Sequence, residues 1–259
     1  MHIEIDLNKS VDENAGTYFD LAKKFKKKIA GTIKIIEETK KKLADLEGKE
    51  STFIDTENKK QEKKQLKKEW YEKFHWFTSS EGFLCIGGKD ATTNEIIIKK
   101  YTSPGDLVFH TDMAGSPFFV IKDGQKAGEA TKNETAQATA AYSRAWKSGH
   151  NVADVFYILP EQVTKEAMSG EYISKGSFMV YGKKNYINAK VECAIGLFEG
   201  KIIGGPVGAI SAKTNKFVII TLGKEKKSDL AKKIRFKLGG GELDDIVTFL
   251  PAGEGEIKK

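Results

Sequence analysis

Residues that could carry chemistry are few and widely separated in this sequence. The four histidines are scattered along the chain, and no GxSxG, HExxH or GxxxxGK[ST] motif is present. His110 and Asp112 stand two apart on a predicted strand, so they point to the same face. They form either a functional polar pair or a turn in which Asp112 caps the chain before Pro117. Because no catalytic constellation is evident, we expect a protein that is not an enzyme.

A phosphate-binding loop is the second candidate site. Gly87-Gly88-Lys89-Asp90 follows a predicted strand and leads into a helix with a Thr92-x-x-Glu95 capping-box pattern. The free N–H groups of a helix N-terminus, with Lys89 beside them, favour a bound anion. The carboxylate of Asp90 could instead occupy the same donors. Two interpretations stay open here, a phosphate contact and an ordinary capped loop.

Basic residues gather in the last quarter of the chain. Between residues 213 and 237 nine basic residues face only Glu225 and Asp229, an excess equal to the net charge of the whole chain, +7. Such a cluster is typical of a nucleic-acid-binding surface, whereas a merely solubilising surface more often mixes both signs. Arg144 and Arg235 are the only arginines. Because lysine is a point charge without the planar fork of arginine, this composition favours contact with the phosphate backbone over sequence readout.

A glycine- and hydroxyl-rich stretch, residues 169–178, is the remaining candidate. It contains Lys175, and Lys183-Lys184 follow shortly after it. Small residues allow a close backbone approach, and loops of this composition often carry binding sites. We therefore count these lysines among the candidate phosphate partners.

The elements that must position these residues fall into two regions. Apolar residues recur at spacings of three and four over residues 22–46, which predicts a coiled-coil helix over residues 14–47 that Gly48 ends. After a linker at residues 51–55, Thr56 caps a second helix that reaches Phe74. The sequence thus predicts an antiparallel helical hairpin. The second helix of this hairpin carries two rows of lysines. Two interpretations stay open for these rows, contact with a polyanion and a solvated helix face.

From Trp76 onward the sequence pattern changes to that of short strands, glycine turns and helices. We expect strands at residues 83–86, 106–112, 118–122, 154–159, 190–198, 201–203 and 216–222, and helices at residues 129–147 and 228–238. The strands at 190–198 and 201–203 pair across Glu199-Gly200. Since no regular βαβ repeat is present, the fold class is α+β. The predicted domains are a hairpin, residues 1–75, and a mixed α+β domain, residues 76–259, of which 190–259 forms a basic sub-unit.

The composition of the chain limits the cellular compartments and the cofactors that we expect for it. The chain has 259 residues, 39% of them hydrophobic and 31% charged, and no apolar run reaches the ~20 residues that a membrane span needs. Met1-His2-Ile3-Glu4 lacks the cationic start of a signal peptide. Cys85 and Cys193 stand in apolar contexts without a CxxC motif. We therefore expect a cytoplasmic protein with no metal and no other cofactor.

Several ordered motifs together resemble one known family. They are the run from Trp70 to Phe83, Gly87-Gly88-Lys89-Asp90-Ala91 with Asn94-Glu95, residues 106–112 with Gly115-Ser116-Pro117, residues 143–147, and the stretches at 169–172 and 181–186. Taken in this order, they are similar to the NFACT-R domain of the archaeal–eukaryotic branch of the NFACT family. The hairpin resembles the middle coiled coil of that family. Full-length members begin with an NFACT-N domain and a helix-hairpin-helix module, neither of which precedes Met1, so the resemblance implies a fragment or a shorter relative.

The resemblance also implies a function. Family members bind the large ribosomal subunit that still carries a stalled peptidyl-tRNA and bring in charged tRNA, so that the nascent chain is extended and cleared. We expect the chain to be a non-enzymatic part of such a factor that contacts tRNA, rRNA or both. The alternative is a protein-interaction scaffold in which the coiled coil docks a partner such as a ubiquitin-ligase-like factor. The candidate nucleic-acid-binding residues are Lys89, Asn94, His110, Arg144, Lys175, Lys183, Lys184, Lys224, Lys226, Lys227, Lys232, Lys233 and Arg235.

Overall fold

The computed structural model describes residues 4–64, 69–165 and 176–258. It divides into two compact units, Met1–Lys68 and Glu69–Lys259. Residues 69–75, which the sequence analysis assigned to the hairpin, lie in the second unit, where Phe74 is buried against Ile86 and Ile97.

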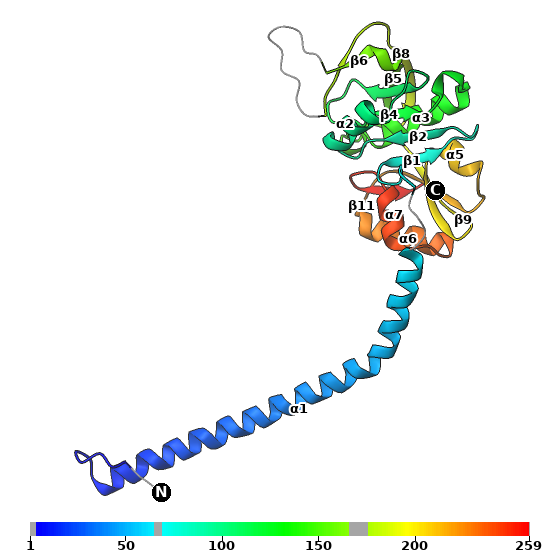
Figure 1. Ribbon diagram of the computed structural model, residues 1–259. Coiled ribbons are helices and arrows are strands. Elements are labelled where there is room, and N and C mark those ends of the chain that lie inside the picture. Colours follow the sequence, from blue (N-terminus) through cyan, green and yellow to red (C-terminus); the bar gives the residue numbers. More distant parts are fainter. Residues whose placement is uncertain (1–3, 65–68, 166–175, 259) are drawn as a thin grey trace. The chain divides into compact units, whose positions relative to one another are not determined.

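The first unit consists of a single helix, α1 (Val11–Lys64), which is drawn as one uninterrupted coil in Figure 1. Ser10 and Glu13 cap its start reciprocally. The N–H of Glu13 donates to the Ser10 hydroxyl at 3.2 Å, and the N–H of Ser10 donates to the Glu13 carboxylate at 2.8 Å. Asp12 and Glu13 in the first turn also complement the positive end of the helix dipole.

The predicted helical hairpin is not confirmed, because α1 continues through Gly48 and through the expected linker at residues 51–55. A glycine inside a helix costs only about 1 kcal/mol relative to alanine. Lysine and glutamate, which are good helix formers, stand on both sides of Gly48, Leu43 and Leu46 precede it, and no proline follows it within α1. The lysine rows predicted between residues 59 and 68 fall on side chains outside the described part of the chain.

The second unit begins with a six-stranded antiparallel sheet of order β1-β2-β4-β3-β5-β8. Its strands are β1 (His75–Thr78), β2 (Leu84–Gly87), β3 (Leu107–Thr111), β4 (Phe119–Ile121), β5 (Val152–Ile158) and β8 (Asn185–Lys190). The helices that accompany it are α2 (Ala91–Lys100), α3 (Glu129–Ala141) and α4 (Arg144–Lys147). Two 3₁₀ turns (Gly124–Lys126 and Pro160–Gln162) and the small pair β6 (Val163–Thr164) and β7 (Met179–Val180) complete this part.

Both faces of this sheet are covered, which explains why its strands are apolar on both sides. Along β3, Leu107 and Phe109 belong to the cluster that contains the alanines of α3, whereas Val108 belongs to the cluster that contains Ile97 of α2. The side chains alternate between the two faces at the period of two that an extended strand imposes.

A four-stranded antiparallel sheet of order β10-β9-β11-β12 follows. It comprises β9 (Cys193–Phe198), β10 (Lys201–Gly205), β11 (Phe217–Glu225) and β12 (Gly255–Ile257), with α5 (Val207–Ser211), α6 (Lys227–Leu238) and α7 (Leu243–Phe249). The predicted hairpin across Glu199-Gly200 is confirmed, since Lys201 pairs with Phe198. The two turn residues, Glu199 and Gly200, have positive φ angles of 49° and 75°. A two-residue hairpin turn of type I′ requires positive φ at both positions.

The two sheets share one hydrophobic core. A single cluster joins Phe109 and Phe119 of the first sheet to Ile195 and Ile220 of the second, with α3 and α6 contributing to it. The α+β class is confirmed. Two predicted elements are divided, however. The strand expected at 190–198 becomes β8 and β9 in different sheets, and the helix expected at 129–147 breaks at Ser143, whose hydroxyl accepts the N–H of Ala145.

No helix in the described part of the chain is both long and apolar enough to span a membrane.

Candidate functional site

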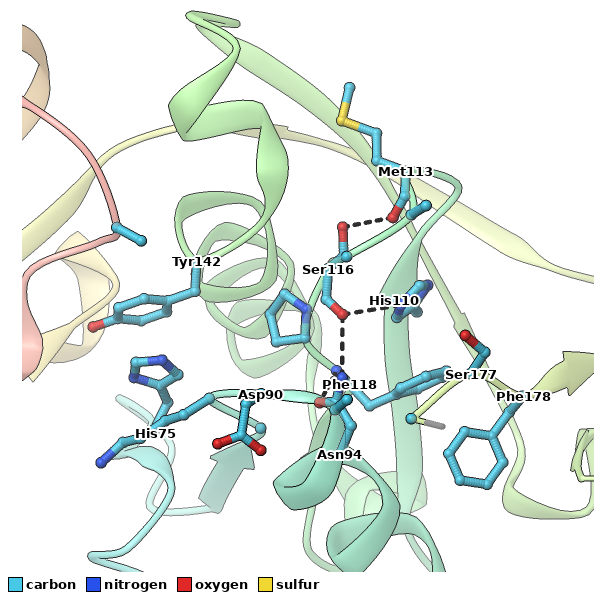
Figure 2. A pocket seen from close by; sticks show the side chains of 18 of the residues that line it. His75, Asp90, Asn94, His110, Met113, Ser116, Phe118, Tyr142, Ser177 and Phe178 are labelled. Atoms are coloured by element: carbon cyan, nitrogen blue, oxygen red, sulfur yellow. Dashed lines mark hydrogen bonds between the residues drawn. The ribbon is translucent and has the colours of Figure 1, made fainter. Parts of the chain in front are cut away.

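A cavity of about 560 Å³ lies where the loops of the first sheet meet the C-terminal segments. Ligand-binding clefts in proteins have this order of size. The lining residues used below are His75, Gly88, Lys89, Asp90, Asn94, His110, Asp112, Ser116, Phe118, Tyr142, Lys227 and Leu250. Figure 2 shows His75 and Tyr142 along one side of this space and His110, Phe118 and Phe178 along another. The fold therefore brings together motifs that are far apart in the sequence.

Four of the predicted site residues line this cavity: Lys89, Asn94, His110 and Lys227. Lys89 is exposed and Asn94 is buried. Lys227 is half-buried, and its ammonium group donates to the carbonyl of Leu250 at 2.9 Å. Burial lowers the pKa of Lys227. Lys227 therefore holds the C-terminal segment in place as well as lining the cavity.

The cap of α2 differs from the prediction. Asp90, and not Thr92, is the N-cap residue, and its carboxylate accepts the N–H of Thr93 at 2.8 Å. The Thr93 hydroxyl in turn accepts the N–H of Asp90 at 2.9 Å. Glu95 instead pairs with Lys165 and Lys99. Aspartate is a preferred N-cap because its short side chain reaches the N–H three residues on, so this carboxylate occupies a donor that the phosphate interpretation left for an anion.

Asn94 fixes the loop between β3 and β4. Its side-chain oxygen accepts the N–H of Phe118 at 3.0 Å, and its amide nitrogen donates to the carbonyl of Ser116 at 3.4 Å. Gly88 must be a glycine for this contact, because a Cβ atom there would stand 1.9 Å from the Asn94 side-chain oxygen. The predicted role of Asn94 in binding is not tested, but its position is that of a loop anchor.

His110 and Asp112 do not contact each other as a catalytic pair. The Nε2 atom of His110 lies 3.2 Å from the carbonyl of Ser116, and its ring stacks on Phe118 at a centroid distance of 4.1 Å. Burial lowers the pKa of His110 to about 4, so the ring is neutral at pH 7 and Nε2–H donates to Ser116. His110 thus anchors the same loop as Asn94, as Figure 2 shows.

Asp112 lies beyond the end of β3 and is exposed. Its carboxylate accepts the Lys184 ammonium at 2.8 Å and the Tyr186 hydroxyl at 2.9 Å. The hydrogen bond from Lys184 holds the pKa of Asp112 below its ordinary value. Lys184 also lies over the ring of Phe156 at 4.3 Å from its centroid. The predicted site residue Lys184 is therefore an ion-pair partner within the protein.

His75 is a cavity residue that the sequence analysis did not select. Its ring stacks on Tyr142 at a centroid distance of 3.9 Å and an interplanar angle of 19°, and the Tyr142 hydroxyl donates to the carbonyl of Phe249 at 2.7 Å. Burial, and then the positive charges of Lys89 and Lys227, lower the pKa of His75 to about 3. No spacing rule connects His75 to Tyr142. The only available signal was the position of His75 within the Trp70 to Phe83 run.

A basic surface, defined here as Lys224, Lys226, Lys232, Lys233, Arg235 and Lys237, covers the end of β11 and the outer side of α6. All six side chains are exposed. Lys232 pairs with Asp229 at 3.1 Å and Lys233 with Glu225 at 2.8 Å. The other four make no ion pair with any residue that the structure describes. Lys227, the first residue of α6, connects this surface to the cavity.

The remaining predicted residues lie elsewhere. Arg144 is exposed on α4, and Lys183 is exposed just before β8. Neither lines the cavity or belongs to the basic surface. Lys175 lies outside the described residues. The twelve candidates that the structure describes thus divide into a group at the cavity, a group on the basic surface, and isolated positions.

Residues 73–182 match the family described as NFACT protein RNA binding domain. The archaeal Rqc2 homolog aRqcH of Methanocaldococcus jannaschii is 42% identical over 209 residues, which cover 77% of this chain and 31% of that protein. The chain contains an NFACT RNA-binding domain. The ribosome quality control complex subunit NEMF of Homo sapiens is 37% identical over 67% of this chain and 16% of its own length. The chain spans less than a third of the length of the curated relatives it matches.

One solved structure aligns more loosely. The C-terminal part of the fibronectin/fibrinogen-binding protein from Streptococcus suis is 22% identical, with a TM-score of 0.40 over 70% of this chain and 76% of that one. The matched NFACT RNA-binding domain contains most of the cavity, whereas the basic surface lies after residue 182. The NFACT domain and the C-terminal sheet nevertheless form one packed unit.

Proposed function

We propose that this chain is the RNA-binding part of a ribosome-associated quality control factor and that it contacts the large ribosomal subunit and tRNA. The match to an RNA-binding domain and the names of the relatives support a role of this kind. Within the proposal the chain is cytoplasmic, binds RNA without catalysing a reaction, and leaves peptide-bond chemistry to the ribosome.

The basic surface is the observation that carries this proposal. Lysine ammonium groups bind phosphates as point charges, and each phosphate that they neutralise releases counterions from the nucleic acid. Lys224, Lys226, Arg235 and Lys237 are exposed and have no acidic partner in the described structure, so they are placed to meet a polyanion. The pKa values of His75 and His110, about 3 and about 4, make both rings weak bases at neutral pH, and the Asp112 carboxylate is held in an ion pair with Lys184, which supports a binding role for this region.

The test is a titration of the full chain into labelled tRNA and into duplex DNA with a similar number of phosphates, at several salt concentrations. The variant replaces the four unpaired residues of the basic surface, Lys224, Lys226, Arg235 and Lys237, by glutamine. A matched control replaces four exposed lysines elsewhere, Lys100, Lys126, Lys190 and Lys201. Lys227 is left intact in both, because it holds Leu250.

We expect the first variant to bind tRNA more weakly and with a shallower salt dependence. The slope of log affinity against log salt should fall by about 0.7–0.9 for each phosphate that the variant no longer neutralises. The control variant should behave as the wild type. A preference for tRNA over DNA supports recognition of RNA. Equal weakening in both variants would mean that only net charge matters, and no binding at low salt would refute the proposal.

The alternative function, a protein-interaction scaffold, is favoured by one observation on α1. Phe25, Ile29, Ile36 and Leu43 recur at spacings of four and seven, and each is about half exposed or more, at 53%, 59%, 48% and 56%. An apolar stripe of this period is typical of a coiled-coil seam that another helix covers. We propose that α1 packs against a helix of a partner protein. Binding through this stripe would be insensitive to salt, which distinguishes it from binding through phosphate contacts.

A further inference from the structure

Phe236 has an unusual position on α6. The buried face of this helix consists of Leu230, Ala231, Ile234 and Leu238, whereas Phe236 points away from it and is 89% exposed. No other large apolar side chain in the described part of the second unit exceeds 54% exposure. Burying a phenylalanine side chain away from water is favourable. A ligand that covers the ring of Phe236 would therefore gain affinity from this burial.

The surroundings of Phe236 are cationic. Lys232 and Lys233 precede it by four and three residues and therefore share its face of the helix. Arg235 and Lys237 flank it in the chain. A hollow of about 540 Å³ adjoins the ring and is lined by Lys232, Arg235, Phe236, Gly239, Gly240 and Leu243.

Gly239 and Gly240 keep this hollow open. Gly239 ends α6 in the left-handed conformation, with φ of 71°, and a Cβ atom at that residue would meet no atom within 4 Å. At Gly240 the only close atom belongs to Leu197, at 3.8 Å. The ring of Phe236 therefore borders open space that is wide enough for a flat group and is edged by two cations.

The charge around the ring decides what covers it. The cores of protein–protein interfaces are depleted in lysine, and a second copy of this surface would bring like charges together. A single-stranded nucleic acid satisfies both features, because unpaired bases stack on aromatic rings while basic side chains follow the backbone. In a duplex the bases are already stacked on one another and cannot reach the ring.

We propose that Phe236 stacks on an unpaired base of single-stranded RNA, with Lys232 and Arg235 contacting the flanking phosphates. This inference rests on the proposed function and specifies it, since it assigns to the basic surface a single-stranded segment and not a duplex. Stacking of one base on an aromatic side chain strengthens binding by roughly tenfold or more. The ring supplies a contact that does not depend on charge, whereas the lysines supply one that does.

The test compares a labelled single-stranded oligoadenylate with an RNA duplex that has the same number of phosphates, using the full chain. Phe236→Ala should weaken binding to the single strand about tenfold and leave its salt slope unchanged, because no charge is removed. Affinity for the duplex should change less than twofold. Phe236→Trp should retain the affinity, and its added fluorescence, relative to the wild type, should be quenched by the bound strand.

Two control variants separate the contributions. Phe236→Leu keeps an apolar side chain but removes the flat ring, so it should behave like Phe236→Ala if stacking is responsible. Lys232→Ala with Arg235→Ala should weaken both ligands and reduce the salt slope. Phe236 is exposed and makes no core contact, so none of these changes is expected to impair folding, which thermal unfolding checks.

Three other results of these experiments would each overturn the stacking proposal or the proposed function. If the wild type binds the single strand and Phe236→Ala binds it equally well, stacking is refuted and the proposed function stands. If the wild type binds neither RNA at low salt, the proposed function itself fails. If Phe236→Ala leaves RNA binding intact but converts a dimer to a monomer in sedimentation, a second copy covers the ring and the proposal is overturned.

Discussion

At the scale of single residues, Gly88 and Asn94 determine the shape of the cavity. The amide of Asn94 holds the loop between β3 and β4 from two sides, through Ser116 and Phe118. The amide has room to do so only because Gly88 carries no side chain. A buried polar group that loses its partners costs about 1–3 kcal/mol.

Gly88→Ala should therefore destabilise the protein by roughly 2 kcal/mol or more, because the new methyl group displaces the Asn94 amide from its partners. Unfolding in urea, followed by circular dichroism, measures the change. Gly105→Ala is the matched control. Its nearest neighbour would be an oxygen of Asp123 at 3.8 Å, so this second substitution should have little effect. Similar destabilisation in both variants would contradict the role given to Asn94.

The two cavity histidines predict how stability depends on pH. Their pKa values in the folded protein, about 3 for His75 and about 4 for His110, lie below the ordinary value of 6.5. The unfolded chain therefore binds protons more tightly, and stability falls as the pH drops below 6.5. Each ring contributes up to about 1.4 kcal/mol per pH unit inside that window.

Urea unfolding at pH 7.0, 6.0 and 5.5 tests this dependence above the range in which carboxylates titrate. We expect the free energy of unfolding to decline across the series in the wild type and to decline less in His75→Gln and His110→Gln, once each variant is compared with itself at pH 7.0. The exposed His150→Gln variant should keep the slope of the wild type. A wild-type slope that both cavity variants share would show that other groups are responsible.

At the scale of elements, Gly48 distinguishes the continuous helix α1 from a hairpin. In a continuous helix, Gly48→Ala and Gly31→Ala should each stabilise α1 by about 1 kcal/mol, because alanine is the better helix former. Gly31 lies well inside α1, has no atom near its missing side chain, and serves as the matched control. The helical circular dichroism signal of the full chain during thermal unfolding measures both. A hairpin would show a gain for Gly31→Ala and a loss for Gly48→Ala.

Sequence signals predicted the elements that depend on neighbouring residues. The alternation at residues 106–112 predicted β3, and the glycine run after Leu238 predicted the end of α6 at Gly239. They failed where two local signals competed, as at Gly48, whose tendency to end a helix was outweighed by the helix formers around it. They also missed two short edge strands, β1, which forms a hairpin with the neighbouring β2, and β12, which pairs with β11 from beyond α6 and α7.

The candidate site was predicted in part for the same reason. The basic surface is a local cluster on one strand and one helix, so counting charges was sufficient to find it. The cavity is formed by contacts over long separations, such as the His75–Tyr142 stack and the bond from Lys227 to Leu250. No spacing within the sequence encodes these contacts. Phe236 was overlooked because a phenylalanine on an amphipathic helix is more often part of the core.

At the scale of the whole molecule, the larger hydrophobic cluster of the second unit extends beyond the matched family domain. Ile195, Ile220 and Ile234 belong to the same cluster as Phe77 and Phe109. Two hydrogen bonds also tie the halves together, from the Tyr142 hydroxyl to the carbonyl of Phe249 and from the Trp146 indole to the carbonyl of Glu254, at 2.8 Å in the second case.

A chain limited to residues 73–182 should therefore not fold into a stable domain, because it exposes the apolar face that β9, β11 and α6 cover in the complete unit. Residues 69–259 should unfold in one cooperative transition. Amide-proton dispersion in NMR spectra and thermal unfolding of both pieces check this. A well-dispersed spectrum for the shorter piece would show that the C-terminal sheet is dispensable for folding.

The two buried cysteines make the opening of this shared core measurable. Cys85 on β2 and Cys193 on β9 are free and fully buried, and burial raises the pKa of each thiol to about 12. Because the thiolate is the reactive species, an alkylating reagent modifies either cysteine only when the protein opens. The two sulfurs belong to different sheets. Equal alkylation rates would therefore show that both sheets open together, and unequal rates would identify which half of the molecule loosens first.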